Sequence, residues 1–272
     1  MATNKDQSSE KNPLVSIIIP TYNRAHLIGR AIETALGQAY QNIEIIVIDD
    51  ASSDETSKEM DKLKDERIKY IRHINNKGPA AARTTGIRAA RGTYIAFLDS
   101  DDEWLPEKLE KQIKIMEGTS PEVGVIYTGC RRIMKGKEYY IPNSKIRKKE
   151  GYIFNTVLRF YMIYMSSVVI KSDVFRSVGL FDEGLPAIAE WDLWIRISKQ
   201  YLFKYINEQL VISYYTSKSM STDRRNSCRA AEIILRKHFK EFIKNKEALI
   251  KILYWIVRSN IGDFLHKIGF IQ

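Results

Sequence analysis

Three acids stand within four residues directly after an apolar, β-prone run. The stretch "YIAFLDSDDEW" (94–104) brings Asp99, Asp101 and Asp102 together. Carboxylates this close repel one another unless a cation or a set of hydrogen-bond donors holds them. An isolated acidic turn of this kind is usually a helix cap, and an EF-hand calcium loop is excluded because no glycine stands at its turn position. Together with a divalent cation, however, such acids would attract phosphate.

Two further polar clusters, "PTYNR" (20–24) and "DDASSD" (49–54), also follow apolar runs. In an open parallel sheet, ligands bind just beyond the carboxyl ends of the strands, near the point where strand order reverses. The helix starts that follow these clusters would offer backbone N–H groups to phosphate. The three clusters therefore predict one ligand site at the edge of a sheet. No glycine-rich loop follows the first run, which excludes a P-loop and disfavours a nicotinamide enzyme.

The elements that must position these clusters alternate between strand and helix. Residues 15–20, 43–50 and 94–98 have the composition of strands buried on both faces, and residues 68–74 alternate like a further strand. The stretch "GPAAARTTGIRAARG" (78–92) is rich in small residues that suit close helix packing. This alternation predicts an α/β fold with a mostly parallel, doubly wound (Rossmann-like) sheet.

The composition fits an ordinary globular protein of 272 residues with a formal net charge of +10. Such a charge could serve nucleic acid, an anionic membrane surface or an anionic substrate, but no nucleic-acid-binding motif accompanies it, so we expect no nucleic acid partner. The two cysteines, Cys130 and Cys228, lack metal spacing and fit a reducing compartment. The polar start lacks a signal-peptide core, and no window is apolar enough to span a membrane. We therefore expect a cytoplasmic protein.

Three blocks of the sequence, in order and spacing, closely resemble the family 2 glycosyltransferases. They are "VSIIIPTYNRAHLIGRAIETALGQAYQNIEIIVIDDASSDET", "ARTTGIRAARGTYIAFLDSDDEWLPEKLEKQ" and "SSVVIKSDVFRSVGLFDEGLPAIAEWDLWIRIS". The resemblance extends over roughly residues 13–215, and it is closest to the bacterial cell-surface polysaccharide enzymes. It implies a glycosyltransferase A-type fold, a nucleotide-sugar donor and inversion at the anomeric carbon.

The resemblance assigns the donor nucleotide to the first half of the chain. The matching positions include Tyr22, which would stack on the base, and Asp50, whose carboxylate would accept a hydrogen bond from the ring N–H of uracil and so favour UDP. Arg83 would offer its charge to the diphosphate, although Thr84 stands where relatives usually have Asn. The full set implied to bind nucleotide is Pro20, Thr21, Tyr22, Asn23, Asp50, Arg83, Asp99 and Ser100.

The "DSD" of residues 99–101 matches the DxD motif of the family. The match implies Asp101 as ligand of Mn²⁺ or Mg²⁺, with Asp99 as a further ligand or a support for the ribose. These ions commonly keep several waters and use one or two carboxylates plus substrate phosphates. Relatives often carry a metal- or diphosphate-binding His in the segment matching "YYTSKSMST" (214–222), which has none here. Lys218 or the hydroxyls would have to contact the phosphate in its place.

Inversion needs a base on the face opposite the diphosphate. In "AIAEWDLWIR" (187–196) the matching acid is Glu190, with Asp192 as the fallback base and acceptor support. Many relatives have another acid where this chain has Ala189. Trp191 and Trp194 are expected to pack the acceptor floor and the core.

We expect a disordered tail at 1–12 and a catalytic domain at 13–221, with a nucleotide-binding half at about 13–105 and an acceptor half at about 106–221. Within the latter, residues 131–154 are polar and basic enough to predict a mobile loop near the acceptor.

The remaining residues, 222–272, are expected to form two basic, amphipathic helices. From residue 224 onward there are eleven Lys or Arg against four Asp or Glu. Such helices fit a packed hairpin, a homodimer face or a surface that lies on anionic lipid.

The activity that the resemblance implies is transfer of a hexosyl or N-acetylhexosaminyl group from a UDP-sugar to a hydroxyl of a saccharide or lipid-linked saccharide. Capsule, lipopolysaccharide or related cell-envelope glycans would be the product. The departures at Ala189, Thr84 and the missing His leave an alternative, a nucleotide-sugar-binding scaffold that has lost turnover.

Overall fold

The computed structural model describes residues 12–215 and 224–267, with side chains described as far as residue 258. Except for residue 12, the expected tail lies outside the described residues, as do Lys218 and the boundary at residue 221. The elements are β1 (Val15–Thr21), α1 (Ala25–Leu36), β2 (Ile43–Asp49), α2 (Thr56–Lys62), β3 (Ile68–Arg72), α3 (Pro79–Ala89), β4 (Tyr94–Phe97), β5 (Asp102–Trp104), α4 (Lys108–Glu117), β6 (Val123–Met134), β7 (Lys137–Ile141), α5 (Phe154–Arg159), η1 (Met165–Ser167), β8 (Val168–Lys171), α6 (Val174–Val178), α7 (Ala189–Ser198), β9 (Leu202–Tyr214), α8 (Arg224–Lys237), α9 (Phe239–Lys244) and α10 (Lys246–Lys267).

One sheet with the strand order β3-β2-β1-β4-β8-β6-β9-β5 runs through the described part of the chain, and β7 pairs with β6. The four predicted strands form its parallel half, β3-β2-β1-β4. From β4 onward the pairing is mixed, because β8 runs antiparallel to both β4 and β6 while β9 runs parallel to β6. The predicted α/β fold is therefore confirmed, with the parallel arrangement concentrated in the first half.

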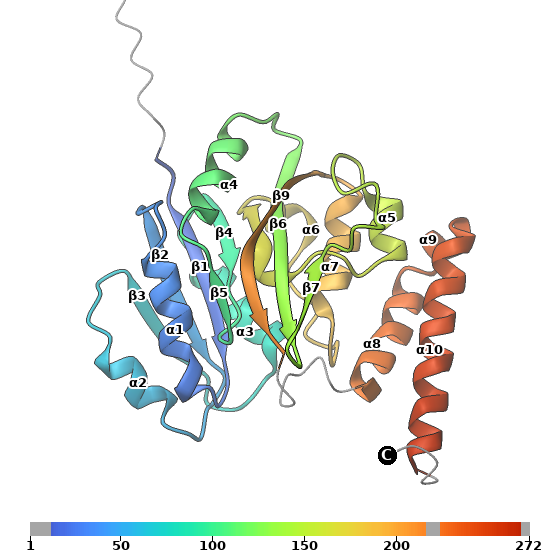
Figure 1. Cartoon of the computed structure of the whole chain (residues 1–272), viewed down its shortest axis with the longest axis horizontal. Coiled ribbons are helices and arrows are strands. Elements are labelled where there is room, and N and C mark those ends of the chain that lie inside the picture. Colours follow the sequence, from blue (N-terminus) through green and yellow to red (C-terminus); the bar gives the residue numbers. More distant parts are fainter. Residues whose placement is uncertain (1–11, 216–223, 268–272) are drawn as a thin grey trace, which may run out of the picture.

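Helices cover both faces of the sheet (Figure 1). Along β1, Ile17 and Ile19 pack with α1 and α4 on one face, whereas Ile18 packs with α3 and α7 on the other. This alternation follows from the two-residue period of a strand, and burial of both faces explains the unbroken apolar run. The small residues of α3 also have the predicted role, because a Cβ on Gly86 would lie 2.4 Å from Ile18 Cγ2.

The segment predicted as a mobile loop, residues 131–154, instead begins with a β-hairpin. Strand β6 continues to Met134 and turns back through Lys135 and Gly136, both at positive φ, into β7. Two consecutive residues at positive φ are typical of the two-residue turns that join antiparallel strands. The prediction of an irregular loop was wrong for this part because basic side chains on an exposed hairpin obscure the strand pattern.

The C-terminal residues form three helices, not the predicted two. A break at His238 separates α8 from α9, and Asn245 separates α9 from α10, whose start it caps by accepting a hydrogen bond from Ala248 N–H at 3.1 Å. The three helices stand at one side of the molecule, next to α5 and α7 (Figure 1). Ala230, Ile234 and Ile252 from these helices share a core with Trp191 of α7. Among the described residues no helix is both long and apolar enough to cross a membrane.

Candidate active site

The three polar clusters predicted from the sequence meet at one edge of the sheet. Because β1 pairs in parallel with β2 on one side and β4 on the other, their carboxyl ends point the same way. Strand order turns at this point, since β2 and β3 extend to one side of β1 and β4 extends to the other. The edge therefore has the geometry at which open α/β sheets bind ligands.

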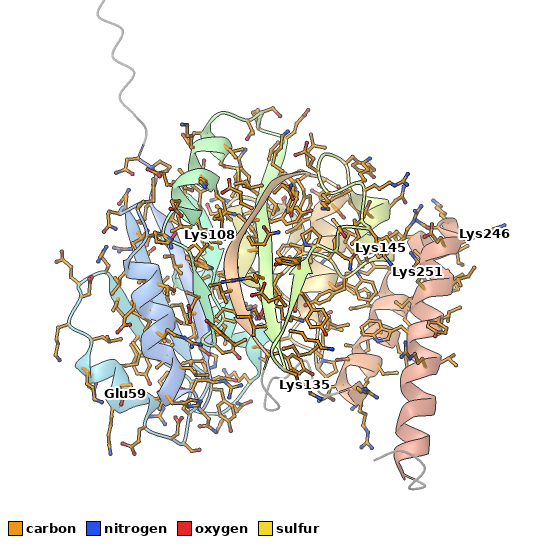
Figure 2. The ribbon with its side chains drawn as sticks, viewed as in Figure 1. Glu59, Lys108, Lys135, Lys145, Lys246 and Lys251 are labelled. Carbon is orange, nitrogen blue, oxygen red and sulfur yellow. The ribbon has the colours of Figure 1, made fainter. Side chains whose placement is uncertain are left out.

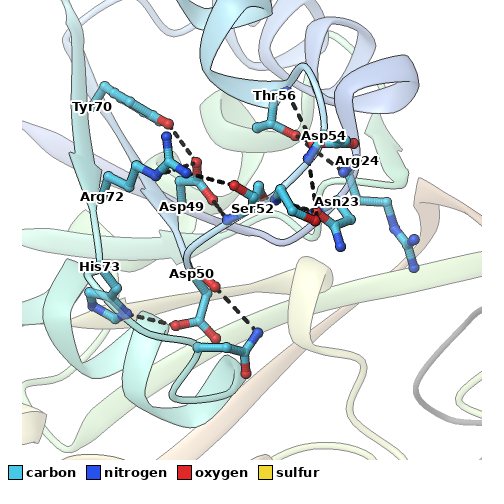
Figure 3. Close-up of polar contacts among 12 residues, drawn as sticks. Asn23, Arg24, Asp49, Asp50, Ser52, Asp54, Thr56, Tyr70, Arg72 and His73 are labelled. Atoms are coloured by element: carbon cyan, nitrogen blue, oxygen red, sulfur yellow. Dashed lines mark hydrogen bonds and ion pairs between the residues drawn. The ribbon is translucent and has the colours of Figure 1, made fainter.

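Asn23 joins the loops that follow β1 and β2. Its backbone adopts a left-handed conformation with φ of 52°, and its Oδ1 accepts hydrogen bonds from the N–H groups of Ser53 at 2.8 Å and Asp54 at 3.3 Å. In return, the N–H of Asn23 donates to Ser52 Oγ at 2.9 Å. Figure 3 shows Asn23, Ser52 and Asp54 converging between the two loops. The side chain of Asn23 thus holds the loops together at the edge where a ligand would lie.

Asp50 lies in the middle of a second set of contacts (Figure 3). Its Oδ1 lies 2.7 Å from His73 Nδ1 and accepts the N–H of Lys77 at 2.9 Å, while Oδ2 accepts the N–H of Gly78 at 2.7 Å. The side chain is buried. Two carboxylate oxygens offer about four lone-pair sites, so three contacts leave one for a ligand donor. Asp50 therefore orders the turn into α3 and can still accept one hydrogen bond from a nucleobase.

The residues at the end of β1 differ sharply in exposure. Tyr22 is 46% exposed, although it directly follows a buried strand. Pro20 and Thr21 are buried, and Thr21 Oγ1 has no hydrogen-bond partner within the described structure. The buried hydroxyl of Thr84 also lacks a partner there. A free aromatic face and unpaired hydroxyls at one edge could serve a ligand that brings its own donors and acceptors.

Arg83 connects the donor-side acids to the predicted base. Its Nη2 donates to Asp99 Oδ1 at 2.7 Å, and its Nη1 lies 4.0 Å from Glu190 Oε2. Burial alone would lower the pKa of this guanidinium, but the charges of Asp99 and Glu190 outweigh it and raise the pKa. Arg83 Nε is buried and unpartnered among the described residues. The fold thus places Asp99, after β4, and Glu190, in α7, on either side of the Arg83 guanidinium of α3, although the three residues are far apart in the sequence.

The three acids after β4 have separate environments. Asp99 pairs with Arg83 and donates its N–H to Ser166 Oγ at 3.0 Å. Asp102 is buried and accepts from Ser166 Oγ at 2.5 Å and from Tyr164 Oη at 3.2 Å. Burial, followed by the charges of Asp99 and Asp101, raises the pKa of Asp102 well above its usual value. Asp102 therefore supports the turn from inside the protein, and Ser100 is buried beside it.

Asp101 is the acid best placed for a cation. Its carboxylate has no side-chain hydrogen bond or ion pair with the described residues, although its backbone oxygen accepts a hydrogen bond from Arg30 at 3.2 Å. Burial and the neighbouring charge of Asp99 raise the pKa of Asp101. No group of three or more metal-binding side chains gathers in the described ranges. One or two carboxylates completed by phosphate oxygens and water would suit Mg²⁺ or Mn²⁺, so these residues fit such an ion as a shared protein–substrate site.

Glu190 lies in the first turn of α7, next to Arg83, with 13% of its side chain exposed. Its Oε1 accepts a hydrogen bond from Tyr161 Oη, and its Oε2 faces the guanidinium. The carboxylate therefore lies between the donor-side acids and the segment that carries Tyr161. Ala189 is buried in the core, so an acid in its place would have to be buried as well.

Asp192 points away from this cluster into the protein. It is fully buried, and its oxygens contact Arg196 Nε at 2.9 Å, His238 Nε2 at 2.8 Å and Lys237 Nζ at 3.0 Å. Although burial opposes it, the hydrogen bond from His238 and the charges of Arg196 and Lys237 lower the pKa of Asp192. This acid joins α7 to α8 and α9, and because it is fully buried and has a lowered pKa it is poorly suited to take a proton from a substrate.

The two tryptophans of α7 are buried, as expected for packing residues. Trp191 is 4% exposed and donates from Nε1 to the carbonyl of Val157 at 2.8 Å, whereas Trp194 is 1% exposed within the core. Trp191 also contacts Tyr161, with ring centroids 6.4 Å apart. Only Trp191 therefore lies next to the segment that holds Glu190.

Four residues of the site were not anticipated from the sequence: His73, Tyr161, Tyr164 and Ser166. His73 binds both Asp50 and, through Nε2 at 3.0 Å, Thr85 Oγ1. The other three lie in "FYMIYMSSVVI" (160–170). Hydroxyls that interrupt an apolar run just before a buried strand could have signalled polar contacts at its start. His73 gave no such signal, because it ends a short alternating stretch with no other motif around it.

Two solved structures in complex with nucleotide sugars share this fold. TarS of S. aureus in complex with UDP-GlcNAc has a TM-score of 0.68 and 16% identity, covering 91% of this chain and 72% of the other. Mannosyltransferase PcManGT of Pyrobaculum calidifontis in complex with GDP-Man and Mn²⁺ has a TM-score of 0.67 and 18% identity, covering 93% and 74%. These two similarities show that the chain has the same fold as both proteins.

Sequence comparison identifies the family of this chain. The model of Glycosyl transferase family 2 matches residues 16–173. An uncharacterized glycosyltransferase of Rickettsia prowazekii is 32% identical over 264 residues, 96% of this chain and 82% of its own length. WfaP of Escherichia coli, described as a UDP-Glc:alpha-D-GlcNAc-diphosphoundecaprenol beta-1,3-glucosyltransferase, is 33% identical over 241 residues, 88% and 86%. The chain therefore belongs to glycosyl transferase family 2.

Proposed function

We propose that this glycosyltransferase moves a hexosyl or N-acetylhexosaminyl group from a UDP-sugar to a hydroxyl of a lipid-linked saccharide, with inversion and with the help of a divalent cation. The observation that carries the proposal is the Arg83 guanidinium, which contacts Asp99 on the donor side and lies 4.0 Å from Glu190 on the other. This arrangement separates a region suited to a nucleotide diphosphate from an acid suited to be the base.

On the donor side, the exposed ring of Tyr22 would stack on the nucleobase, and Asp50 would accept the ring N–H of uracil with its remaining lone pair. Arg83 would offer positive charge to the diphosphate. Asp101, with Asp99 beside it, would hold Mn²⁺ or Mg²⁺, which when bound stabilises negative charge on the departing UDP. WfaP, at 33% identity, uses UDP-Glc according to its description, which favours UDP over the GDP of the archaeal neighbour.

On the acceptor side, Glu190 would take the proton of the attacking hydroxyl. As the hydroxyl oxygen bonds to the anomeric carbon and the bond from that carbon to UDP breaks, the proton would pass to Oε1, which Tyr161 holds in the free protein. Asp192 is less suited to this role because its oxygens are engaged by Arg196, Lys237 and His238. The described acceptor of WfaP, GlcNAc-diphosphoundecaprenol, supports a lipid-linked saccharide as substrate.

Such an acceptor would bring the protein to the inner face of the plasma membrane, where it would contribute to a capsule, lipopolysaccharide or related envelope glycan. One face of α10 supports peripheral contact with that membrane. Ile250, Leu253, Tyr254 and Val257 recur at helical spacing and are each between 43% and 67% exposed. The excess of basic residues after residue 223 complements anionic lipid.

The test is a donor panel read by UDP release and by product analysis. Purified protein with α-D-GlcNAc-diphospho-hexanol as acceptor should transfer from one UDP-sugar, and EDTA should stop the reaction. The product of an α-linked donor should carry a β-linkage by NMR. Glu190→Gln should lower the rate by about a thousandfold without weakening UDP binding, since a positioned base contributes on that order. Glu183→Gln, an exposed acid in the preceding loop, is the matched control.

Two outcomes would contradict the proposal in different ways. UDP binding without transfer from any UDP- or GDP-sugar would favour the scaffold alternative. Transfer at the normal rate by Glu190→Gln would remove the base assignment while leaving the transferase assignment intact.

A further inference from the structure

A cavity of about 510 Å³ lies next to Glu190, bordered by its neighbours Tyr161 and Trp191. Its walls come from the β6–β7 hairpin, the segment between α5 and η1, α7 and α10. Tyr161 and Trp191 line it, and Tyr161 is the residue whose hydroxyl bonds to Glu190. A molecule in this cavity could therefore present a hydroxyl to the proposed base by displacing a single hydrogen bond.

The cavity is positively charged. Arg132, Arg159 and Lys251 line it, and they come from β6, α5 and α10. Arg159 and Lys251 both pair with the same acid, Glu247, at 2.9 Å. Arg132 has no ion pair with any acid in the described part of the chain, and its guanidinium carbon lies 4.9 Å from the centroid of the Tyr164 ring. One acid for three cations leaves a net charge of about +2 on these walls.

Two of these guanidinium groups also have unused donors. The Nε atoms of Arg132 and Arg159 are buried and have no hydrogen-bond partner within the described structure. A buried donor without a partner costs free energy, and native proteins rarely leave one unless a ligand or water completes it. Arginine presents N–H groups in a fixed fork that matches the oxygens of phosphate. The cavity therefore has the chemistry of an anion site.

Most of the other residues that line the cavity are apolar or aromatic. Phe160, Ile252 and Trp255 line it, the ring centroids of Trp191 and Trp255 lie 5.7 Å apart, and Lys251 Nζ lies 3.9 Å from the centroid of the Phe160 ring. An ammonium over an aromatic face keeps its charge close to an apolar wall. Figure 2 shows Lys251 on the side of α10 toward the sheet, whereas Lys246 extends outward from the end of the same helix.

We infer that this cavity binds the acceptor by its sugar–diphosphate junction, with Arg132, Arg159 and Lys251 around the phosphates and the Phe160–Trp255 wall against the first carbons of the lipid. The inference rests on the proposed function and adds to it that helix α10 forms part of the acceptor site. A neutral saccharide would leave the net positive charge of these walls without a counter-charge. The substrate class is therefore a saccharide attached through a diphosphate to an alkyl or isoprenoid chain.

Binding without turnover tests the inference. Calorimetry in the presence of UDP would compare α-D-GlcNAc-diphospho-hexanol with the neutral hexyl α-D-GlcNAc. Wild-type protein should bind the diphosphate at least about tenfold more tightly, because a charge-assisted hydrogen bond contributes on that order. Arg132→Gln and Lys251→Gln should each reduce that preference by about tenfold while the Kd for UDP stays unchanged. Lys246→Gln on the outer side of the same helix is the control.

Equal affinity of wild-type protein for the two hexyl ligands would overturn the inference. The inference would also be overturned if Arg132→Gln lost affinity for UDP but kept the preference for the diphosphate ligand. That result would place Arg132 in the donor site. Trp255→Leu gives a second route, because it removes part of the apolar wall but no charge, and it should weaken both hexyl ligands equally. If no UDP-sugar supports transfer while the diphosphate preference and its loss in the variants are observed, the proposed function fails and the site stands.

Discussion

At the scale of single residues, the site depends on which acids have partners. Asp99 has Arg83, Asp102 has Ser166 and Tyr164, and Asp50 has His73 and two backbone donors. Asp101 alone among the acids after β4 has no side-chain partner in the described structure. A carboxylate with a raised pKa and no partner is the one that gains most from a bound cation.

Asp101→Asn should therefore remove the metal dependence of UDP binding. In wild-type protein, Mn²⁺ should lower the Kd for UDP. In the variant, the Kd for UDP in Mn²⁺ should be at least about tenfold higher than in wild type, while the Kd in EDTA changes little. The reason is that an amide is a much poorer ligand than a carboxylate for these ions. Calorimetry with and without Mn²⁺ measures this. Asp61→Asn, an exposed acid of α2, should behave as wild type. Metal-dependent binding that survives in Asp101→Asn would show that another residue holds the ion.

At the scale of elements, the parallel half of the sheet could be read from the sequence because both of its faces are buried, so apolar runs mark its strands within a few residues. The β6–β7 hairpin and the break at His238 could not be read, since exposed basic residues conceal both patterns.

Helix α4 contains a buried lysine that the sequence pattern did not indicate. Lys108 (labelled in Figure 2) is fully buried. It donates to Gln112 Oε1 at 2.7 Å and lies 4.0 Å from the centroid of the Trp104 ring.

Burial lowers the pKa of Lys108 well below its usual value, which predicts a pH-dependent stability. Between that lowered pKa and about 10.4, the unfolded chain binds the proton and the folded protein does not, so the free energy of unfolding rises with pH by up to about 1.4 kcal/mol per unit. Lys108→Met removes this term. The stability of the variant relative to wild type should therefore fall as the pH rises from 6 to 8.5, measured by urea unfolding.

The Lys108→Met variant also leaves Gln112 Oε1 without its donor, a cost that is the same at every pH. The test is therefore how the difference in unfolding free energy between Lys108→Met and wild type changes with pH, and not how large that difference is at one pH. Lys114→Met, at an exposed position of α4, should give a difference that does not change with pH. A Lys108→Met difference that is equally flat would mean that the buried amine stays protonated.

At the scale of the whole molecule, the C-terminal helices are joined to α7, the helix that carries the proposed base. Asp192 of α7 contacts both Lys237 and His238, and α10 lines the cavity beside Glu190. The helices that were expected to form an extension therefore share a core with the helix that carries Glu190, while the opposite face of α10 is exposed and apolar. One helix could in this way face both the acceptor and the lipid that carries it.

The exposed face of α10 predicts binding to anionic vesicles. Wild-type protein should float with vesicles of phosphatidylcholine and phosphatidylglycerol but much less with phosphatidylcholine alone. The double substitution Ile250→Ser and Tyr254→Ser should weaken binding by at least about tenfold, since each buried apolar side chain contributes about 1.5–3 kcal/mol. Ile74→Ser, a nearly fully exposed apolar position far from α10 in the sequence, is the control. A dimer by light scattering that the double substitution dissociates would assign this face to self-association instead.

The sequence by itself determined the α/β class, the parallel strands and the acids at their ends, because local periodicity records which faces of an element are buried. It also singled out Glu190, Arg83 and Asp99, through the order of its motifs. Only the tertiary structure decided that Arg83 lies between Asp99 and Glu190 and that Asp192 belongs to an internal ion-pair network. It also decided that a cationic cavity adjoins the proposed base. Those facts depend on contacts between residues far apart in the chain, and local pattern carries no record of them.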